Sequence, residues 1–473
     1  MTVNRESNIL QYFATVAACL SAFTSSAMIA WTSPTLQKLE KNNPVADDNP
    51  FGHAITADES SWISSLPILA TVLGCFFFGY LAKRWGRRKS LLSCVIPFSI
   101  SWIFVGLAKS ITTLCIGRII GGFAIGAPLS VIPMYTAEIS DKSIRGTLSS
   151  FMQVFLNIGW IFSFSIGPYV SYDILWMSCA TLPFLFFITF YLMPESPYYL
   201  ASQGEHEKMI QVLIKFRGNI GNDLVKAEAD EIKVSIDCVQ AAARLETSIM
   251  DLFRIPSNFR ALWYSCIMFT FQNFSGAIVV LNNAESIFTA TGVSNTVSPA
   301  VSVIIIGVVQ LVFCCITPLF VDNWGRKMLL ILSGIGETLS LAALGLYFYL
   351  SENANNGDGD VSGISWLPIT SMIFFFATFS IGWGPLPWTV MSEIFASDIK
   401  TKAFGIIITV NGLVAFLILK FFPTIVVYFG MHSVFWLFAI ICFIGILFTI
   451  FVLPETKGKS LKEIQKQLGS HDV

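Results

Sequence analysis

Twelve long apolar stretches, joined by more polar segments, restrict most strongly what this chain can fold into. Each has roughly the 20 residues that an α-helix needs to cross the hydrocarbon core of a bilayer. Only 12% of the 473 residues are charged, against about 25% in soluble domains. The sequence therefore predicts an all-α membrane protein with twelve transmembrane helices. The expected spans are 11–32, 61–82, 90–110, 112–135, 147–168, 174–193, 259–288, 297–321, 328–350, 366–391, 403–427 and 433–453.

Composition and motifs exclude several classes of function. The formal net charge is −1, so nothing indicates a nucleic-acid partner. Nine of the ten cysteines, all except Cys238, lie in apolar stretches without any CxxC spacing, which indicates neither a disulfide framework nor a zinc site. The chain also lacks HExxH, GxSxG and P-loop motifs. We therefore expect no enzyme, no metal and no cofactor.

The distribution of Lys and Arg predicts the orientation in the membrane. The connection between spans two and three holds five such residues and the one between spans six and seven holds seven, whereas the connections 7–8, 9–10 and 11–12 hold none. Loops rich in Lys and Arg stay in the cytoplasm. We therefore expect a multi-pass protein with both termini cytoplasmic. Its sequence ends in GSHDV, which is neither a retention nor a peroxisomal signal, so we expect it in the plasma membrane.

A more polar segment divides the spans into two sets of six. Residues 194–258 are typical of short amphipathic helices and are too polar to cross a bilayer. We expect an N-terminal six-helix bundle at 1–193, a cytoplasmic helical linker at 194–258, a C-terminal six-helix bundle at 259–454 and a cytoplasmic tail at 455–473. The two bundles should be pseudo-symmetric, and we expect the protein to work as a monomer in the lipid bilayer.

Three motifs recur in the same order in the two halves. RWGRRK at 84–89 is repeated as NWGRKM at 323–328, and YTAEISDKSIRG at 135–146 as VMSEIFASDIKTKAFG at 390–405. PESP follows span six, and PETK follows span twelve. Parallel repeats of six spans are typical of secondary transporters, which hold their substrate between the halves near the bilayer midplane.

The repeated motifs combine acids with Arg or Lys at helix ends, and they predict a cytoplasmic gate. Exposed ion pairs are worth about 0–1 kcal/mol each, which suits a reversible contact; a plain positive-inside anchor is the alternative. Arg118 is the second residue of GRIIGGFAIG, and we expect it at the cytoplasmic end of span four. The glycines of that motif would let another helix approach closely. The expected gate residues are Arg87, Arg88, Arg118, Glu138, Arg145, Glu195, Asp322, Arg326, Lys327, Glu393, Lys400 and Glu455.

Taken together, GRIIGG, PESP, PETKG and GWGPLPW resemble the sugar porter family of the major facilitator superfamily, and the resemblance runs along essentially the whole chain. AWTSPTL at 30–36 and FSIGWGPLPW at 379–388 are similar to the insect branch of facilitated trehalose and glucose transporters. The resemblance implies the major facilitator fold, alternating access and a small-molecule sugar substrate. It also implies a pocket lined by spans five, seven, eight, ten and eleven.

At the positions that match the family's pocket, the chain carries uncharged amides and aromatic rings. An amide both donates hydrogen bonds to sugar hydroxyls and accepts them, and an aromatic ring offers a flat apolar face to the C–H side of a pyranose. Hydrogen bonding between helices is the alternative explanation for any single amide. The substrate-binding residues that the resemblance implies are Gln153, Gln272, Asn273, Gln310, Phe379, Trp388 and Asn411.

Span seven departs from the family pattern. Ile278 replaces an asparagine that contacts the sugar, and Asn282 and Asn283 replace two tyrosines that help close the outer gate. The resemblance therefore leaves the identity of the sugar and transport competence open.

The mode of transport follows from span one. Proton-coupled members of the family carry an acid there, but FATVAACLSAFTSSAMIAWTSP has none. We therefore expect facilitative uniport of a neutral sugar, a hexose or trehalose. Glu285, Glu337 and Lys420 lie within other spans and keep a proton-coupled symporter open; we expect Glu285 and Lys420 to reach the outer interface. A sugar receptor that does not transport is a further alternative.

Overall fold

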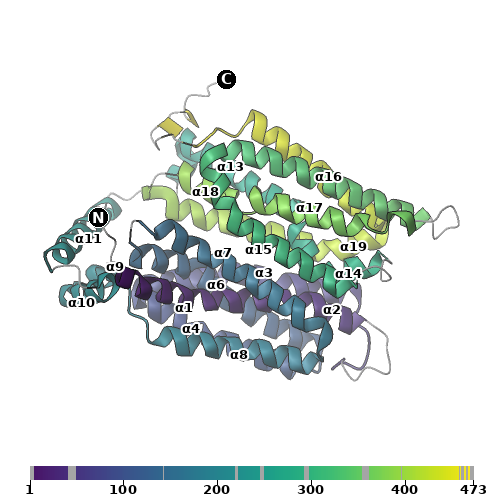
Figure 1. The fold of residues 1–473 in the computed structure, drawn as a ribbon, viewed down its shortest axis with the longest axis horizontal. Helices are drawn as coiled ribbons and strands as arrows, with labels where there is room; N and C mark the ends of the chain where they lie inside the picture. The colour runs from purple at the N-terminus through teal and green to yellow at the C-terminus, as the bar shows by residue number, and fades with distance from the viewer. Residues whose placement is uncertain are drawn as a thin grey trace. The chain divides into compact units, whose positions relative to one another are not determined.

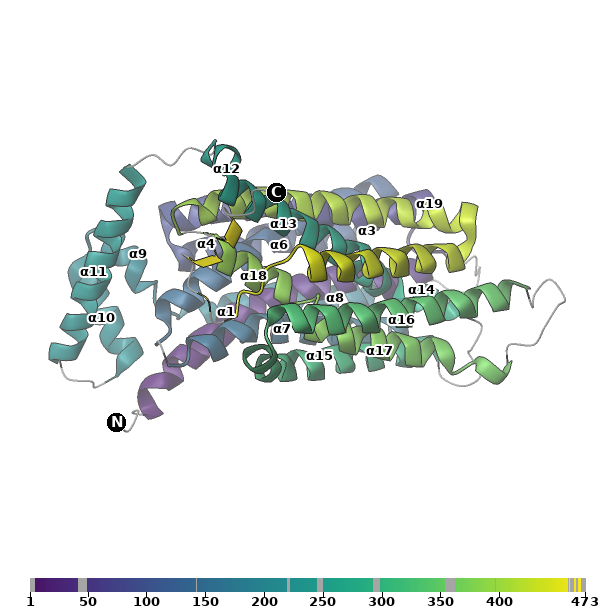
Figure 2. The same cartoon turned by 90° about the horizontal axis from the view of Figure 1, so that it is seen from above.

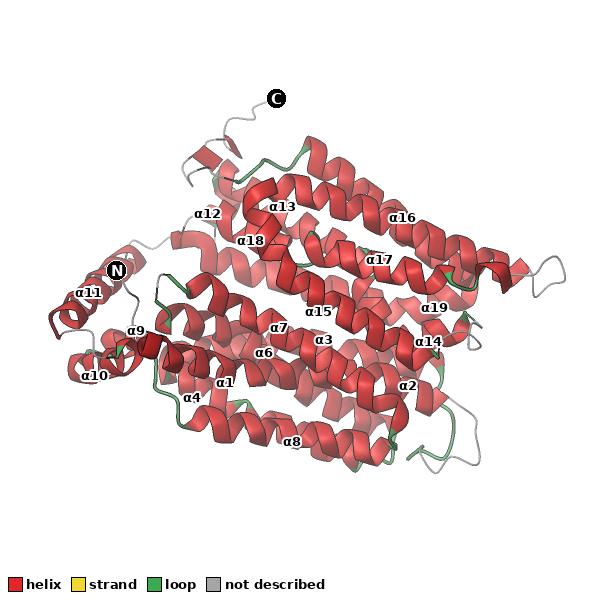
Figure 3. Cartoon of the chain, viewed as in Figure 1, coloured by secondary structure: helices red, strands yellow, loops and turns green. Residues whose placement is uncertain are grey.

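The computed structural model is helical along nearly all of the chain that it describes. It describes residues 5–40, 49–141, 143–218, 222–244, 250–291, 298–353, 362–395, 397–457, 459, 463–464 and 467–468, and this part contains no strand (Figure 3). The α-helices are α1 (Arg5–Ala30), α2 (Thr32–Glu40), α3 (Ala57–Trp85), α4 (Arg87–Ser93), α5 (Val95–Gly106), α6 (Ile111–Ile139), α7 (Arg145–Ile166), α8 (Tyr172–Tyr191), α9 (Pro197–Ser202), α10 (His206–Arg217), α11 (Asn222–Arg244), α12 (Asp251–Arg254), α13 (Pro256–Phe274), α14 (Ala277–Ala290), α15 (Pro299–Trp324), α16 (Arg326–Asn353), α17 (Leu367–Ile381), α18 (Leu386–Ile394) and α19 (Ser397–Phe451). Short 3₁₀ turns lie at Gly167–Tyr169 and Ser362–Ile364.

The described helices account for the predicted twelve crossings. Within the described residues, eleven helical segments are long and apolar enough to span a membrane, and the last of them, Lys402–Phe451, has 50 residues. Figure 1 labels α19, the helix that contains this last segment. One crossing needs only about 20 residues. Gly430, inside this segment, has φ 78° and ψ 161°, and Figure 2 shows α19 doubling back on itself. This segment therefore supplies two spans, and the prediction of an all-α protein of twelve transmembrane helices is confirmed.

Two spans that the sequence predicts as continuous, 259–288 and 366–391, are interrupted in the structure. The break between α13 and α14 lies at Gly276, whose φ of 83° is readily adopted only by glycine. The break between α17 and α18 lies in the GWGP stretch, where Gly382 has φ −125° and ψ −85°. Breaks inside a membrane free backbone polar groups, which other parts of the protein must then satisfy.

The chain forms two compact units, and each is described by itself. The first unit comprises Met1–Ile29, Leu69–Trp160 and Asp173–Thr247, and the second comprises Ala30–Ile68, Ile161–Tyr172 and Ser248–Val473. The second unit therefore contains short segments from the first six spans together with all of the last six.

Glycines in the first unit allow α3 and α6 to touch backbone to backbone. A Cβ atom added to Gly126 would lie 2.2 Å from the carbonyl carbon of Gly74, and one added to Gly74 would lie 2.1 Å from the carbonyl oxygen of Phe123. Gly121 leaves room for the side chain of Met28 of α1 in the same way. The predicted close approach at GRIIGGFAIG is confirmed at these two positions of α6.

Residues of the predicted linker form the helices α9 to α12, and α10 is held against α1 and α6 of the first unit. Arg217, at the end of α10, is buried; it pairs with Glu228 of α11 at 2.7 Å and donates to the carbonyl of Ile139 at 3.0 Å. Gln11 of α1 donates to the carbonyl of Phe216 at 2.9 Å. These bonds tie the linker to the ends of α1 and α6.

The contact between α3 and α6 gives a direct test of the packing. We expect Gly74→Ala to destabilise the protein by about 1–3 kcal/mol, because the added methyl group meets a backbone oxygen that cannot move aside. Gly79, five residues later on α3, has nothing within 4 Å of its Cβ position. The matched Gly79→Ala variant should therefore be neutral or slightly stabilising. Thermal unfolding in detergent measures both variants, and equal midpoints would contradict the packing.

Candidate functional site

The Gly-Arg motifs build the same turn twice. Gly86 precedes α4 with φ 98°, and Gly325 precedes α16 with φ 83°, a region of backbone conformation that favours glycine. A Cβ atom at Gly86 would lie 2.3 Å from Oε2 of Glu195, and one at Gly325 would lie 3.0 Å from Oε2 of Glu455. Glycine is therefore required in both motifs by the backbone conformation and by the close approach of a glutamate.

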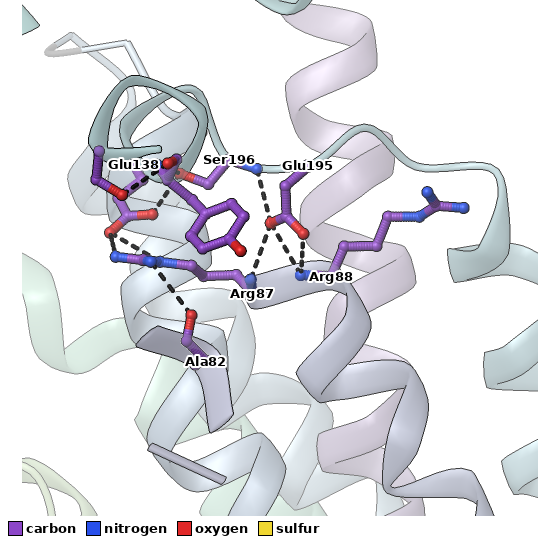
Figure 4. Close-up of polar contacts among 8 residues, drawn as sticks. Ala82, Arg87, Arg88, Glu138, Glu195 and Ser196 are labelled. Atoms are coloured by element: carbon purple, nitrogen blue, oxygen red, sulfur yellow. Dashed lines mark hydrogen bonds and ion pairs between the residues drawn. The ribbon is translucent and has the colours of Figure 1, made fainter. Parts of the chain in front are cut away.

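The glutamate of PESP binds the first turn of α4 (Figure 4). Glu195 Oε1 accepts hydrogen bonds from the backbone N–H groups of Arg87 at 2.9 Å and Arg88 at 3.0 Å. These groups have no partner inside the helix, so the carboxylate acts as a cap. Burial raises the pKa of Glu195, whereas hydrogen bonds from the backbone of Arg88, Ser196 and Arg87 and the charge of Arg87 oppose this rise. The donors thus stabilise the charged form of the cap.

An ion pair completes the first cluster. The Arg87 guanidinium donates to Oε1 of Glu138 at 2.7 Å from Nη2 and at 3.2 Å from Nε, and both side chains are mostly buried. Ser196 donates from Oγ to the other oxygen of Glu138. Figure 4 shows Arg88 pointing away from both acids; its guanidinium donates to the carbonyl of Tyr191 at the end of α8.

The second half repeats these contacts. Glu455 of PETK accepts from the backbone N–H groups of Arg326 and Lys327, both at 3.1 Å. Arg326 pairs with Glu393 at 2.9 Å, as Arg87 pairs with Glu138. Lys327 donates to the carbonyl of Ile450 at the end of α19 at 2.8 Å, as Arg88 does at the end of α8. Each cluster therefore joins three helix ends within its own half.

Among the described contacts, two further predicted gate residues, Arg145 and Lys400, bond to backbone carbonyls rather than to these acids. Arg145 donates to the carbonyl of Ser140 at 3.4 Å, and Lys400 donates to the carbonyl of Ser392 at 2.9 Å. The side chain of Asp322 lies outside the described residues.

The predicted location of Arg118 at the cytoplasmic end of span four is wrong. Arg118 lies seven residues after the start of α6 at Ile111, whereas Glu138 lies at the opposite end of this 29-residue helix. Twenty residues of helix separate the two positions by about 30 Å. Arg118 is 1% exposed and donates from Nη1 to the carbonyl of Met28 of α1 at 2.6 Å. It therefore braces the two helices inside the first unit rather than belonging to a gate.

Polar side chains predicted to bind sugar are gathered at the helix breaks of the second unit. Asn273, near the end of α13, donates to Oδ1 of Asn411 of α19 at 2.6 Å. Its neighbour Gln272 donates from Nε2 to the backbone carbonyls of Trp383 at 2.8 Å and Gly384 at 2.7 Å, inside the break between α17 and α18. The structure thus connects spans seven, ten and eleven through three amides.

The predicted aromatic residues flank the same break. Phe379 lies on its α17 side, and its carbonyl accepts from the N–H of Gly384 at 2.8 Å. Trp388 lies on its α18 side, 39% exposed, with its ring centroid 4.6 Å from that of Phe269 of α13. The two aromatic residues therefore lie on either side of the break that Gln272 binds.

Two predicted site residues are not joined to this group by any hydrogen bond that the described residues make. Gln310 of α15 is buried, and its Oε1 has no partner in the part of the chain that the structure describes. Gln153 lies on α7 in the first unit, with its side chain exposed.

The partner of Gln272, the backbone of the GWGP break, is not predicted from the sequence. Two glycines and a proline within four residues are a signal for a helix break, and they stand in a motif that was used only for its resemblance.

Lys420 connects α19 to the start of α3 within the second unit. Its Nζ lies 2.5 Å from Oδ1 of Asp58, donates to Ser61 at 2.8 Å and lies 4.1 Å from the ring centroid of Trp62. Asp58 is at the end of α3 opposite to the cluster of Glu195. This contact links the first and second halves of the sequence.

Helix α2, which follows span one, is held against α14 of span seven in a similar way. The backbone N–H of Glu285 of α14 donates to Ser33 of α2 at 3.2 Å, and Gln37 of α2 donates to Thr289 of α14. The Glu285 side chain is mostly buried rather than extended into solvent.

Comparisons with known proteins agree over nearly the whole chain. The family described as "Sugar (and other) transporter" matches residues 14–468. The facilitated trehalose transporter Tret1 of Culex quinquefasciatus is 34% identical over 463 residues, which cover 96% of this chain and 86% of that relative. Tret1 of Aedes aegypti is 32% identical over 97% of this chain, which spans only 55% of that relative. The xylose transporter XylE from E. coli, solved in a partially occluded inward-open conformation, has a TM-score of 0.77 at 24% identity and covers 95% of this chain and 99% of its own.

The ion pair between Arg87 and Glu138 is expected to stabilise the fold. Alanine replacements of each residue and of both should reveal a coupling energy of about 1–3 kcal/mol, because either single change leaves a partly buried charge without its partner. The exposed pair of Lys208 and Glu205 in the linker, at 3.1 Å, is the control and should give about 0–1 kcal/mol. Unfolding of the purified protein measures both, and equal coupling energies would contradict a structural role for the cluster.

Proposed function

Because the chain belongs to the sugar transporter family and has the twelve-helix fold of the major facilitator superfamily, we propose that it carries a neutral sugar, a hexose or trehalose, across the plasma membrane by facilitated uniport. It is a multi-pass membrane transporter and not an enzyme. Relatives named facilitated trehalose transporters support both the sugar and the facilitated mode.

The observation that carries the proposal is the group of amides at the broken helices. Gln272 is hydrogen-bonded to the backbone of the break between α17 and α18, and Asn273 is hydrogen-bonded to Asn411. Amides donate and accept hydrogen bonds without bearing charge, so these side chains can bind the hydroxyls of a sugar. Trp388 lies on α18, just after the break that Gln272 binds, and supplies a partly exposed aromatic ring. An uncharged polar site with an aromatic wall suits a neutral sugar better than an ion or an amino acid.

Alternating access requires contacts that break on one side while the other closes. The clusters around Glu195 and Glu455 each brace one half of the chain, and we infer that the halves, residues 1–193 and 259–454, move as bodies. Contacts from Asp58 to Lys420 and from Gln37 to Thr289 join segments of different halves at the opposite helix ends. We assign the helix ends that carry these contacts to the outside of the cell and both termini to the cytoplasm. These contacts must therefore break when the transporter opens outward. We also propose that a single chain is the working unit.

Uniport is supported by the surroundings of Arg118. Span one carries no acid, and the guanidinium instead binds the carbonyl of Met28. A carboxyl that binds and releases a proton beside this arginine is therefore absent from span one. Proton coupling through another span would require a different carboxyl.

The proposal predicts sugar flux without current. In oocytes that express the chain, uptake of labelled trehalose or glucose should exceed that of controls. It should change little between about pH 5.5 and about pH 7.5, because uniport moves no proton with the sugar and span one carries no acid that could bind one. A competition panel of trehalose, glucose, fructose and sucrose identifies the preferred sugar.

Two other results would overturn parts of the proposal. A sugar-evoked inward current that grows in acid would make the protein a symporter. Sugar binding without counterflow of labelled sugar in proteoliposomes would make it a receptor.

A further inference from the structure

Glu337 is an acidic side chain within a transmembrane helix, and the transport scheme leaves it unused. It lies on α16 in the second unit and is 1% exposed. It takes part in none of the ion pairs formed by the described residues. Its polar contacts are Oγ of Ser333 at 2.7 Å and Sγ of Cys442 at 3.8 Å. Acidic residues at membrane depth are costly and mark functional positions.

Ser333 connects this carboxyl to the break between α17 and α18. Its Oγ donates to Oε1 of Glu337 and accepts from the backbone N–H of Trp383 at 3.1 Å. A helical serine ordinarily turns its hydroxyl to the carbonyl four residues earlier, as Ser340 does toward Gly336 at 2.7 Å. The carboxyl of Glu337 therefore keeps the serine proton away from its own helix and leaves the oxygen free to accept from Trp383.

The far side of the break holds Gln272. Trp383 follows Gly382, the residue that caps the end of α17. The backbone N–H and C=O of Trp383 are therefore not used by a regular helix. The carbonyls of Trp383 and Gly384 accept from the Gln272 amide at 2.8 and 2.7 Å. A continuous hydrogen-bonded path therefore runs from Glu337 through the serine and the backbone of Trp383 to Gln272.

We propose that Glu337 is a positioning residue for the sugar site, which acts through Ser333 and the backbone of Trp383 to fix the amide of Gln272. The inference rests on the proposed function, since Gln272 contacts a sugar only if the protein binds one. The carboxyl works as a hydrogen-bond acceptor in this role, so a neutral side chain with an oxygen at the same place can replace it. A leucine of similar size cannot.

The test compares kinetics with backbone protection. Glu337→Leu and Ser333→Ala should each raise the KM for sugar uptake on the order of tenfold, the effect of one lost hydrogen bond. The maximal rate per transporter at the surface should stay within about twofold. Glu337→Gln should behave like the wild type. In the purified protein, hydrogen exchange of the Trp383 amide should become faster in Glu337→Leu and in Ser333→Ala but not in Glu337→Gln.

Ser340→Ala is the matched control, because this buried serine of α16 bonds only within its own helix among the described contacts. It should change neither KM nor exchange at Trp383. In a Gln272→Ala background, Glu337→Leu should add nothing to KM.

Several outcomes would overturn the inference. One is unchanged hydrogen exchange of the Trp383 amide in Ser333→Ala. Another is an additional increase in KM when Glu337→Leu is introduced into the Gln272→Ala background. A third is loss of transport in a folded Glu337→Gln variant, which would assign Glu337 a titrating role instead. A wild-type protein that moves no sugar would overturn the proposed function; exchange at Trp383 would then still report separately on the hydrogen-bonded path.

Discussion

Polar groups inside a bilayer must find their hydrogen-bond partners within the protein, and the rest of the structure depends on this requirement. The chain breaks two of its transmembrane helices, at Gly276 and in the GWGP stretch, and each break frees backbone groups. Side chains satisfy the second break: Gln272 binds its carbonyls, and Ser333 binds an N–H. The amide that holds the break is thus also a proposed sugar contact, so the geometry of the site and the integrity of the fold rest on the same bonds.

The second organising feature is the repetition of a small electrostatic unit. In each half a glycine with positive φ lets a glutamate approach and cap a helix, and an arginine then pairs with a second glutamate. These contacts remain within a half and join its helix ends, which favours movement of each half as one body. Contacts that join segments of different halves, such as that of Lys420 with Asp58, lie at the other ends of the helices. Contacts that hold one half together and contacts that break during transport can therefore lie at opposite ends of the same helices.

Much of the fold could be predicted from sequence, because apolar length and repeated motifs are local signals. The close approach at Gly126 followed from the same kind of signal. The positions of Arg118 and Glu337 could not be predicted, since they depend on which neighbouring helix supplies a partner: a carbonyl of α1 in one case and a serine and a broken helix in the other. The pairing of Gln272 with backbone was missed because the GWGP stretch was treated as part of an unbroken span. The amides Asn273 and Asn411 were singled out by resemblance, and only the structure joins them.

The central claim is that a neutral, amide-lined site at the broken helices binds the sugar. Uptake by Gln272→Ala, measured at equal surface expression, tests it most directly, with Gln203→Ala on the exposed part of the linker as the control. The account predicts that Gln272→Ala loses most of the sugar uptake while Gln203→Ala keeps it. Uptake by Gln272→Ala that equals the wild type in both KM and maximal rate would contradict the account.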